Sequence, residues 1–299
     1  MARPVNIRNI QIRDPFIVPV PRERMYYLFG TTDNDPWKAP GQGFNAYRSG
    51  DLFEWEGPFR VFEADSGFWG THNFWAPEVH IYRDKFYMFA SFIAPERCRG
   101  TQILHADNIL GPYVPLGPFP VTPAGWECLD GTLYIERNQK PWLVFCHEWV
   151  QAVDGEICAL PLSDDLSSPI GNARVLFKAS DASWTKTIPR RDGTGIADAR
   201  VTDGPFLWTM ENNALLMFWS SISEKGYAMG AAMSESGGIL GSWRQNDRPL
   251  IDSDGGHGMA FKRFDGSLCL AFHSPNETPL ERLKLIGISE TDINFFRES

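Results

Sequence analysis

Several features that mark large protein classes are missing from this sequence. It has five cysteines, an odd number, and no pair has the CxxC spacing of a zinc site, so neither a zinc ribbon nor a disulfide framework is predicted. No apolar run is long enough to span a bilayer, and the first residues include no apolar signal segment. We therefore expect reduced and mostly buried cysteines, no membrane partner and a cytoplasmic location.

Positive charge is in the minority. Lysine and arginine number 28 against 37 aspartate and glutamate residues, which gives a net charge of −9. Nucleic acids and anionic membranes require basic patches, so neither is expected as a partner. The chain is 43% hydrophobic and 13% aromatic, enough to bury a large core. Its 299 residues fit a single domain that spans the whole sequence, 1–299.

A short pattern recurs along the chain, in which an apolar strand leads to Ser-x-Asp or a similar turn. Its copies begin at Ser49, Ala106, Ser163 and Ser234, in steps of about 57 residues and one longer step. A polar loop inserted over Ser183–Ala197 accounts for the longer step. Each unit contains a similar order of short strands joined by hairpin signals such as Asp265-Gly266, and no amphipathic helix of useful length interrupts them.

Units of this length with about four strands each are typical of propeller blades. Five such units predict an all-β fold, a five-bladed β-propeller. The fifth unit lacks a closing strand, and the N-terminal run Val5–Ile12 is the candidate to supply it, because closing the ring from both termini removes free sheet edges. A generic β-sandwich is the alternative, and the near-constant period makes it the less favoured one.

Three aspartates stand at similar points of the repeat: Asp14 before Pro15, Asp130 before Gly131 and Asp203 before Gly204. Each begins a run that would form the innermost strand of its blade, so the three carboxylates are expected to meet at one mouth of the central channel. Paired carboxylates are the usual chemistry for cutting glycosidic bonds. A single aspartate before Pro or Gly often only initiates a turn, but three at repeat spacing favour a shared acidic site.

The pattern resembles glycoside hydrolase family 43 over nearly the whole chain. The likeness rests on five motifs in order, namely Arg13-Asp14-Pro15, Trp75-Ala76-Pro77-Glu78, Asp130, Asp203-Gly204-Pro205 and Gly256-His257-Gly258. Each motif alone is weak, and their order at blade spacing makes the resemblance specific. The family includes arabinanases, α-L-arabinofuranosidases and β-xylosidases, which are five-bladed propellers that hydrolyse with inversion.

The resemblance implies a role for each carboxylate. Asp14 matches the general base, and Asp130 matches the aspartate that raises the pKa of the acid and orients it. The family's general acid usually stands in Glu-Gly-Pro, where this chain has Asp203, which is shorter by about 1.5 Å. Either the substrate sits deeper, or another carboxylate donates the proton. Glu148, expected at the end of a strand on the rim, is the first substitute, and Glu78 is the second.

His257 begins the first strand of the fifth unit, between two glycines. The resemblance implies that a histidine at this point lies near a channel ion, often calcium, or near ordered water. Calcium prefers oxygen ligands, so one histidine is weak support for a metal site, and a hydrogen-bonded channel histidine is an equal alternative. The hydrolysis itself requires no cofactor, and a structural Ca²⁺ is the one ion considered.

Further polar and aromatic residues are expected around the same mouth, because antiparallel second strands end where the inner strands begin. Histidines would hydrogen-bond sugar hydroxyls, tryptophans would stack on a sugar face, and an arginine would contact a carboxylate or the sugar. The expected substrate-binding residues are His72, Trp75, Glu78, His147, Trp149, Arg200 and His273.

The sequence thus predicts a glycoside hydrolase that acts with inversion on α-L-arabinofuranosides or β-xylosides of plant polysaccharides. Exo action is favoured, because loops over Pro36–Gly43 and Ser183–Ala197 would wall a pocket. Asp203 in place of glutamate also fits a carbohydrate-binding propeller that has lost catalysis. A propeller for protein interaction is a third class, which the acidic channel mouth disfavours. The predicted oligomeric state is a monomer or a small homo-oligomer.

Overall fold

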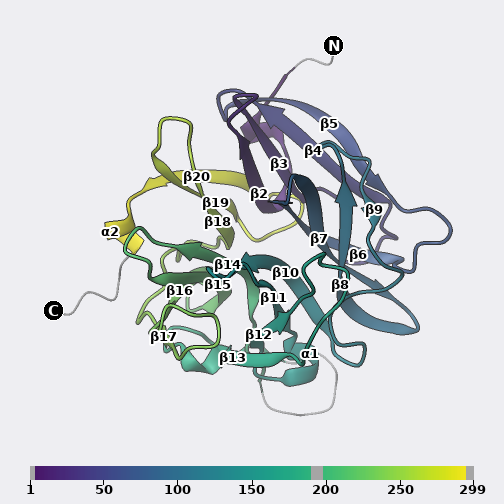
Figure 1. The fold of residues 1–299 in the computed structure, drawn as a ribbon. Helices are drawn as coiled ribbons and strands as arrows, with labels where there is room; N and C mark the ends of the chain where they lie inside the picture. Colours follow the sequence, from purple (N-terminus) through teal and green to yellow (C-terminus); the bar gives the residue numbers. More distant parts are fainter. Residues whose placement is uncertain (1–3, 190–197, 294–299) are drawn as a thin grey trace.

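Five antiparallel sheets stand around a central axis in the computed structural model, which describes residues 4–189 and 198–293 (Figure 1). The fold is the five-bladed β-propeller that the repeat predicts. Each sheet is one blade, and the chain passes through the blades in sequence order, from purple to yellow in Figure 1. The innermost strand of each blade comes first, apart from a short N-terminal strand in the first blade.

The first two blades span residues 5–115. In the first, the order is β1-β5-β4-β3-β2, with β1 (Val5–Asn6), β2 (Arg13–Val20), β3 (Met25–Thr31), β4 (Gly43–Ser49) and β5 (Glu54–Glu63). The second runs outward through β6 (His72–Tyr82), β7 (Lys85–Ala94), β8 (Arg97–Ala106) and β9 (Val114–Pro115).

The remaining three blades follow the same plan. The third contains β10 (Cys128–Ile135), β11 (Pro141–His147), β12 (Glu156–Pro161) and β13 (Arg174–Lys178). The fourth contains β14 (Asp203–Thr209), β15 (Leu215–Ser223), β16 (Gly226–Ser234) and β17 (Trp243–Gln245). The fifth contains β18 (Gly256–Lys262), β19 (Leu268–Ser274) and β20 (Arg282–Ile288).

Helices are short throughout the described residues. The 3-10 turns are η1 (Ile7–Asn9) and η2 (Ala179–Asp181), and the α-helices are α1 (Trp149–Ala152) and α2 (Glu290–Ile293). None of the helices in residues 4–189 and 198–293 has the length and apolar character needed to cross a membrane. The insertion expected over Ser183–Ala197 falls between the third and fourth blades, and its residues 190–197 lie outside the described part of the chain.

The N-terminal run Val5–Ile12 does not close the fifth blade as a fourth strand, contrary to the expectation from the sequence. Its strand β1 pairs with β5 of the first blade. The turn η1 then redirects the chain, so the run does not continue as a fourth strand of the fifth blade. The run contacts β20 through an isolated bridge between Gln11 and Arg282 and through a hydrogen bond from Arg282 Nε to the Arg8 carbonyl at 3.0 Å. The Ile12 amide also donates to the Glu281 carbonyl at 3.2 Å.

Apolar side chains fill the spaces between neighbouring blades, because both faces of each twisted sheet are covered. Between the first two blades, Phe44 of β4 packs against Phe92 of β7, with ring centroids 5.7 Å apart. Between the third and fourth, Trp219 is fully buried against Trp184. All five cysteines are free, and only Cys98 is incompletely buried. This packing holds the inner strands rigidly around the axis.

Candidate active site

Every inner strand carries a β-bulge near its start, at the same end of the channel. The register shifts lie between Arg13/Phe16, Trp75/Glu78, Leu129/Thr132, Asp203/Phe206 and Gly256/Met259. The bulge residues with positive φ are Asp14 (51°), Ala76 (46°), Asp130 (56°), Gly204 (50°) and His257 (47°). Bulges re-aim side chains, and left-handed non-glycine residues cluster at functional sites. The five bulges thus mark one functional end of the propeller.

Asp203 does not occupy the same position as the other two aspartates. It pairs with Ser220 one residue before its bulge, as Arg13 pairs with Thr31 in the first blade. The left-handed position in the fourth blade belongs to Gly204, whose equivalents are Asp14 and Asp130. The sequence pattern concealed this offset, because Pro or Gly follows the aspartate in all three motifs although it serves a different bulge position in the fourth blade.

Asp14 is surrounded by donors. Thr31 Oγ1 donates to its Oδ2 at 2.9 Å, and His257 Nδ1 lies 3.1 Å from its Oδ1. Burial acts to raise the pKa of Asp14, but the charge and hydrogen bond of His257, together with the nearby Arg13, outweigh burial and lower it. Asp14 is therefore ionised at neutral pH.

The pKa values of Asp130 and Asp203 are raised, in contrast to that of Asp14. Burial, with the charge of Asp14 adding to it, raises the pKa of Asp130 to about 6, although His257 and the amide of Gly204 act against the rise. Burial and the charge of Asp130 raise the pKa of Asp203 to about 7. The Gly204 amide donates to Asp130 Oδ2 at 3.0 Å, and the Tyr227 hydroxyl donates to Asp203 Oδ2 at 3.1 Å. Near neutral pH this pair retains a proton.

His257 links the first and third blades. Its Nδ1 lies 3.1 Å from Asp14 Oδ1 and 3.6 Å from Asp130 Oδ2. Burial opposes a charge on the ring, but the two carboxylates raise the pKa of His257 to about 10. The ring packs against Gly204, where an added Cβ would meet the imidazole at 2.6 Å. The glycine at this point therefore makes room for the charged histidine beside the carboxylates.

The three aspartates and His257 line one cavity of about 250 Å³. Other lining residues come from all five blades and their loops, among them Arg13, Trp37, Trp75, Glu148, Trp149, Ile188, Tyr227 and Asn276. Glu148 is buried and paired with Arg99, whose guanidinium also stacks 4.4 Å from the Trp75 ring centroid. Burial raises the pKa of Glu148, and the charge of Arg99 works in the opposite direction.

Several predicted substrate-binding residues do not line this cavity. His147 stacks on Trp126 and bonds Glu156 Oε2 at 2.9 Å. Arg200 donates to the Thr185 carbonyl at 2.6 Å. His72 hydrogen-bonds the hydroxyl of the neighbouring Thr71. Glu78 is buried and pairs with His80. The structure thus brings together Trp75 and Trp149 from the predicted set, and places these four elsewhere.

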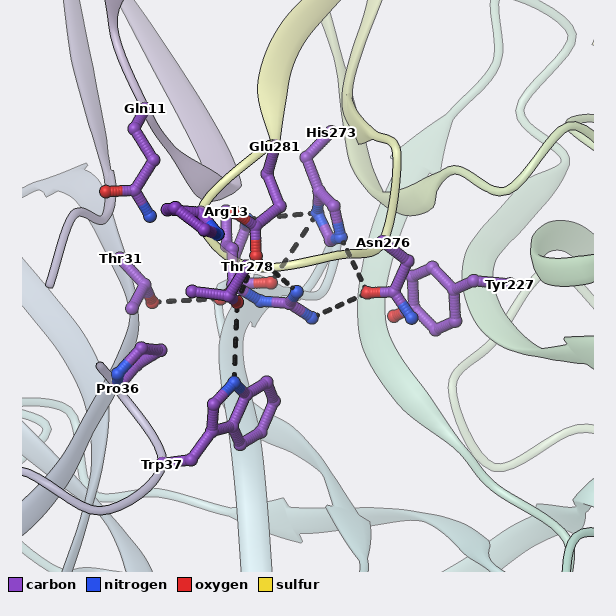
Figure 2. A network of polar contacts seen from close by, with 12 residues as sticks. Gln11, Arg13, Thr31, Pro36, Trp37, Tyr227, His273, Asn276, Thr278 and Glu281 are labelled. Carbon is purple, nitrogen blue, oxygen red and sulfur yellow. Dashed lines mark hydrogen bonds and ion pairs between the residues drawn. The ribbon is translucent and has the colours of Figure 1, made fainter. Parts of the chain in front are cut away.

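His273 is fully buried beneath Asp14. The Asp14 amide donates to its Nδ1 at 3.2 Å, so the ring proton stands on Nε2, which donates to Asn276 Oδ1 at 3.2 Å. Burial lowers the pKa of His273 to about 4 and keeps it neutral. Figure 2 shows Asn276 between this histidine and Arg13. His273 therefore orients Asp14 and Asn276 and does not reach the cavity.

The sequence reasoning missed a polar network at the boundary of the first and last blades (Figure 2). Arg13 donates to Glu281 Oε1 at 2.8 Å and to Asn276 Oδ1 at 2.7 Å, and its guanidinium lies 5.0 Å from the Trp37 ring centroid. Trp37, which is 50% exposed, donates to Thr278 Oγ1 at 3.4 Å. Only the arginine of the Arg-Asp-Pro motif signalled this network, because the other members lie in loops without a repeat position.

His257 is the residue beside which the sequence predicts a channel ion. Its Nε2 is buried without a hydrogen-bond partner in the described structure, and the charged ring carries a proton there, which suits an ordered water molecule better than a cation. Within residues 4–189 and 198–293, no group of three or more His, Cys, Asp or Glu side chains is arranged to hold a metal ion. Calcium takes about six to eight oxygen ligands. An ion here would therefore draw most of its ligands from water, and it stays a prediction.

A propeller with three channel-mouth carboxylates of unequal acidity defines the site of a glycoside hydrolase. The family model for glycosyl hydrolases family 43 matches residues 4–287, and the chain belongs to this family. It is an enzyme of the glycosidase class, acts on carbohydrate, and uses chemistry that needs no cofactor.

Solved structures of similar shape support the assignment. An endo-arabinase from Bacteroides thetaiotaomicron has a TM-score of 0.89 and 38% sequence identity, over 97% of this chain and 98% of its own. An endo-1,4-beta-xylanase from the same organism has a TM-score of 0.73 and 26% identity, with coverage of 94% and 91%. An alpha-L-arabinofuranosidase from Lactobacillus brevis shares the fold, with a TM-score of 0.74 and 18% sequence identity over 95% of this chain and 93% of its own. No curated protein sequence matches the chain.

Proposed function

We propose that this protein hydrolyses α-L-arabinofuranosyl linkages with inversion of the anomeric centre. The observation that carries the proposal is the division of proton affinity among three carboxylates around one cavity. Asp14 is held ionised, whereas Asp203 retains a proton up to a pH of about 7. Inverting glycosidases need one carboxylate and one carboxylic acid on opposite sides of the bond to be cut.

Asp14 acts as the general base. Its charge is maintained by His257 and Arg13, and its orientation is fixed by Thr31 and by the bond from its amide to His273. A water molecule between the sugar and Asp14 would lose a proton to the free carboxylate as it attacks the anomeric carbon. Inversion requires base and acid to stand about 6.5–9.5 Å apart, which residues from different blades of a ring can satisfy.

Asp203 acts as the general acid, and Asp130 keeps it protonated. The charge of Asp130 raises the pKa of Asp203 to about 7 in addition to the effect of burial. The neutral carboxyl then donates its proton to the leaving oxygen. Glu148 is a weaker candidate for this role, because the guanidinium of Arg99 pairs with it. Glu78 is weaker still, because it does not line the cavity.

The substrate class follows from the cavity and from the similarity to the arabinase. A volume of about 250 Å³ lies below the range of about 300–1,000 Å³ for drug-sized ligands, and suits one or two sugar units. Trp37 lines the cavity where the first and last blades adjoin, and its bond to Thr278 holds it there. We infer that the ring bounds the cavity on this side, which supports exo action on chain ends. The 38% identity to an endo-arabinase supports arabinofuranosyl over xylosyl units.

The test is to incubate the protein with linear arabinan, arabinofuranosyl oligosaccharides and xylo-oligosaccharides. Exo action on arabinan should release monosaccharide from the first minutes, whereas early release of longer oligosaccharides would indicate endo action. The anomer first formed, followed by NMR, should be inverted. A retained anomer, or turnover of xylosides alone, would contradict the proposal.

Asp203 in place of glutamate also favours a second candidate, a propeller that binds carbohydrate without cleaving it. Asp14→Asn separates the two. An enzyme should lose nearly all turnover on this change while it still binds the sugar. A binding propeller should show no turnover in either form, with sugar affinity unchanged, as measured by calorimetry.

A further inference from the structure

A ring of hydrogen bonds joins the blades around the cavity. We call each boundary between neighbouring blades a joint. At four of the five joints, the backbone N–H of a bulge residue donates to a side chain on the second strand of the preceding blade. The pairs are Ala76 to Thr31 at 2.9 Å, Asp130 to Ser91 at 2.9 Å, His257 to Ser220 at 2.8 Å and Asp14 to His273 at 3.2 Å. The ring fixes the orientation of each bulge and of the side chain that it carries.

The joint between the third and fourth blades departs from this pattern. The accepting side chains all stand opposite the residue before a bulge, as Ser220 stands opposite Asp203. In the third blade that position belongs to Cys146, opposite Leu129. The amide that should complete the ring is that of Gly204, and it donates instead to Asp130 Oδ2 at 3.0 Å.

The thiol of Cys146 explains the departure. Sulfur is a weak hydrogen-bond acceptor, whereas the hydroxyls of Ser91 and Ser220 at the equivalent positions accept readily. Cys146 is fully buried, and burial raises the pKa of its thiol well above the ordinary value, so it stays neutral. A neutral thiol leaves the Gly204 amide without a competing acceptor on the third blade.

We propose that Cys146 is a positioning residue for the hydrolysis: because it offers no strong acceptor, the Gly204 amide is available to orient and stabilise the Asp130 carboxylate. The role rests on the proposed function, since it acts through Asp130 on Asp203. Beside Asp14 the equivalent amide is that of Ala76, and it donates to Thr31 Oγ1 at 2.9 Å and not to the carboxylate.

The hydrogen bond determines where a shared proton resides. A donor to the ionised form of a carboxylate favours that form. Burial and the repulsion of Asp14 raise the pKa of Asp130, and the bond from the Gly204 amide lowers it. With Asp130 ionised, the proton of the pair stays on Asp203, where the leaving group needs it. Without the bond, the proton would move toward Asp130 and the acid would lose its function.

Cys146→Ser and Cys146→Ala separate this role from packing. Serine reproduces the acceptor of the other joints, so its hydroxyl should accept the hydrogen bond of the Gly204 amide. The amide would then no longer donate to Asp130. Alanine removes the sulfur and adds no acceptor, so the bond to Asp130 should persist. A hydrogen bond to a charged group is worth enough to change kcat about tenfold. We expect kcat near pH 6 to fall by about that factor in Cys146→Ser, with both limbs of the pH profile displaced upward.

The alanine variant should keep kcat within about twofold and the profile of the parent, since it leaves the Gly204 amide bonded to Asp130. Equal losses in Cys146→Ser and Cys146→Ala, with unchanged profiles, would mean that the residue only fills space, and would overturn the proposal.

A second measurement needs no turnover. In protein labelled with [¹⁵N]glycine, the Gly204 amide shift should follow the ionisation of Asp130 in the parent and in Cys146→Ala, and should lose this titration in Cys146→Ser. A Gly204 amide that titrates identically in both variants would contradict the assignment. If the amides behave as expected but arabinan is not cleaved, the proposed function fails while the control of the amide by Cys146 stands.

Discussion

The imidazole of His257 and the carboxylate of Asp14 form a buried ion pair, with Nδ1 3.1 Å from Oδ1. The pair keeps the base ionised, and the same charge lowers the pKa of Asp130, so His257→Asn should raise the pKa of both Asp14 and Asp130 by removing the charge. Asparagine tolerates the positive φ of this position better than most residues. The acid limb of kcat/KM should move to higher pH, and kcat near neutral pH should fall about tenfold or more. Unchanged limbs with a normal melting temperature would contradict this role.

The parent enzyme should show a narrow bell-shaped dependence of kcat/KM on pH. Activity should fall as the pH drops through about 6, because protonation of Asp130 removes the charge that tunes the acid. It should also fall as the pH rises through about 7, because Asp203 then loses its proton. The two midpoints belong to the pair of aspartates together. Initial rates in buffers of constant ionic strength provide the measurement, and undiminished activity well above pH 7 would refute Asp203 as the acid.

Asp203→Asn and Glu148→Gln distinguish the two candidate acids. Loss of a general acid costs about 10²–10⁴-fold in rate on a substrate with a poor leaving group. We expect that loss for Asp203→Asn, with a smaller loss on aryl arabinofuranosides, whose leaving groups need less protonation. Glu148→Gln should keep most of kcat, because its partner is Arg99. The reverse ranking of the two variants would assign the acid to Glu148.

Asn276 should contribute to substrate binding. Its Oδ1 accepts from Arg13 and His273, which directs its amide NH₂ away from both, and the residue lines the cavity. Asn276→Asp keeps the acceptor, removes the donor and adds a carboxylate to the cavity, so KM should rise about tenfold, with kcat compared at the pH optimum of each variant. Asn276→Ala is the companion variant, and it also deprives Arg13 of a partner. A KM equal to that of the parent in Asn276→Asp would exclude contact with the sugar.

The ion pair of Arg13 and Glu281 should stabilise the fold. The Glu281 side chain is 0% exposed and its Oε1 lies 2.8 Å from Arg13 Nη1. Removing one partner of a buried pair costs about 3–5 kcal/mol, because the other charge is left uncompensated. Glu281→Ala should therefore lower the free energy of unfolding by about that amount in urea titrations. Arg48, whose pair with Glu56 is exposed, offers a control, since Arg48→Ala should change stability by less than about 1 kcal/mol.

Much of the architecture could be predicted because a propeller repeats its pattern. The spacing of turn motifs is a local signal, and it located the inner strands that carry Asp14, Asp130 and Asp203. The closure by the N-terminal run was harder to predict, since η1 breaks the strand within a sequence of ordinary β-type residues.

The composition of the site was less predictable, because it depends on side-chain direction. His273 has the expected strand position but points beneath Asp14, and His147 is held by Glu156 and Trp126. Trp37 and Asn276 come from loops, which carry no periodic signal. Neither the offset of Asp203 nor the missing acceptor at Cys146 can be recognised before the bulges fix the register.

Arg13 has a mechanical consequence for the enzyme as well as an electrostatic one. The first blade adjoins the last, and the bond from Arg13, which lines the catalytic cavity, to Glu281 fastens this seam. Any loosening that parts the seam must also displace the neighbour of Asp14. Catalysis should therefore cease at the first opening of the ring, before the individual blades come apart.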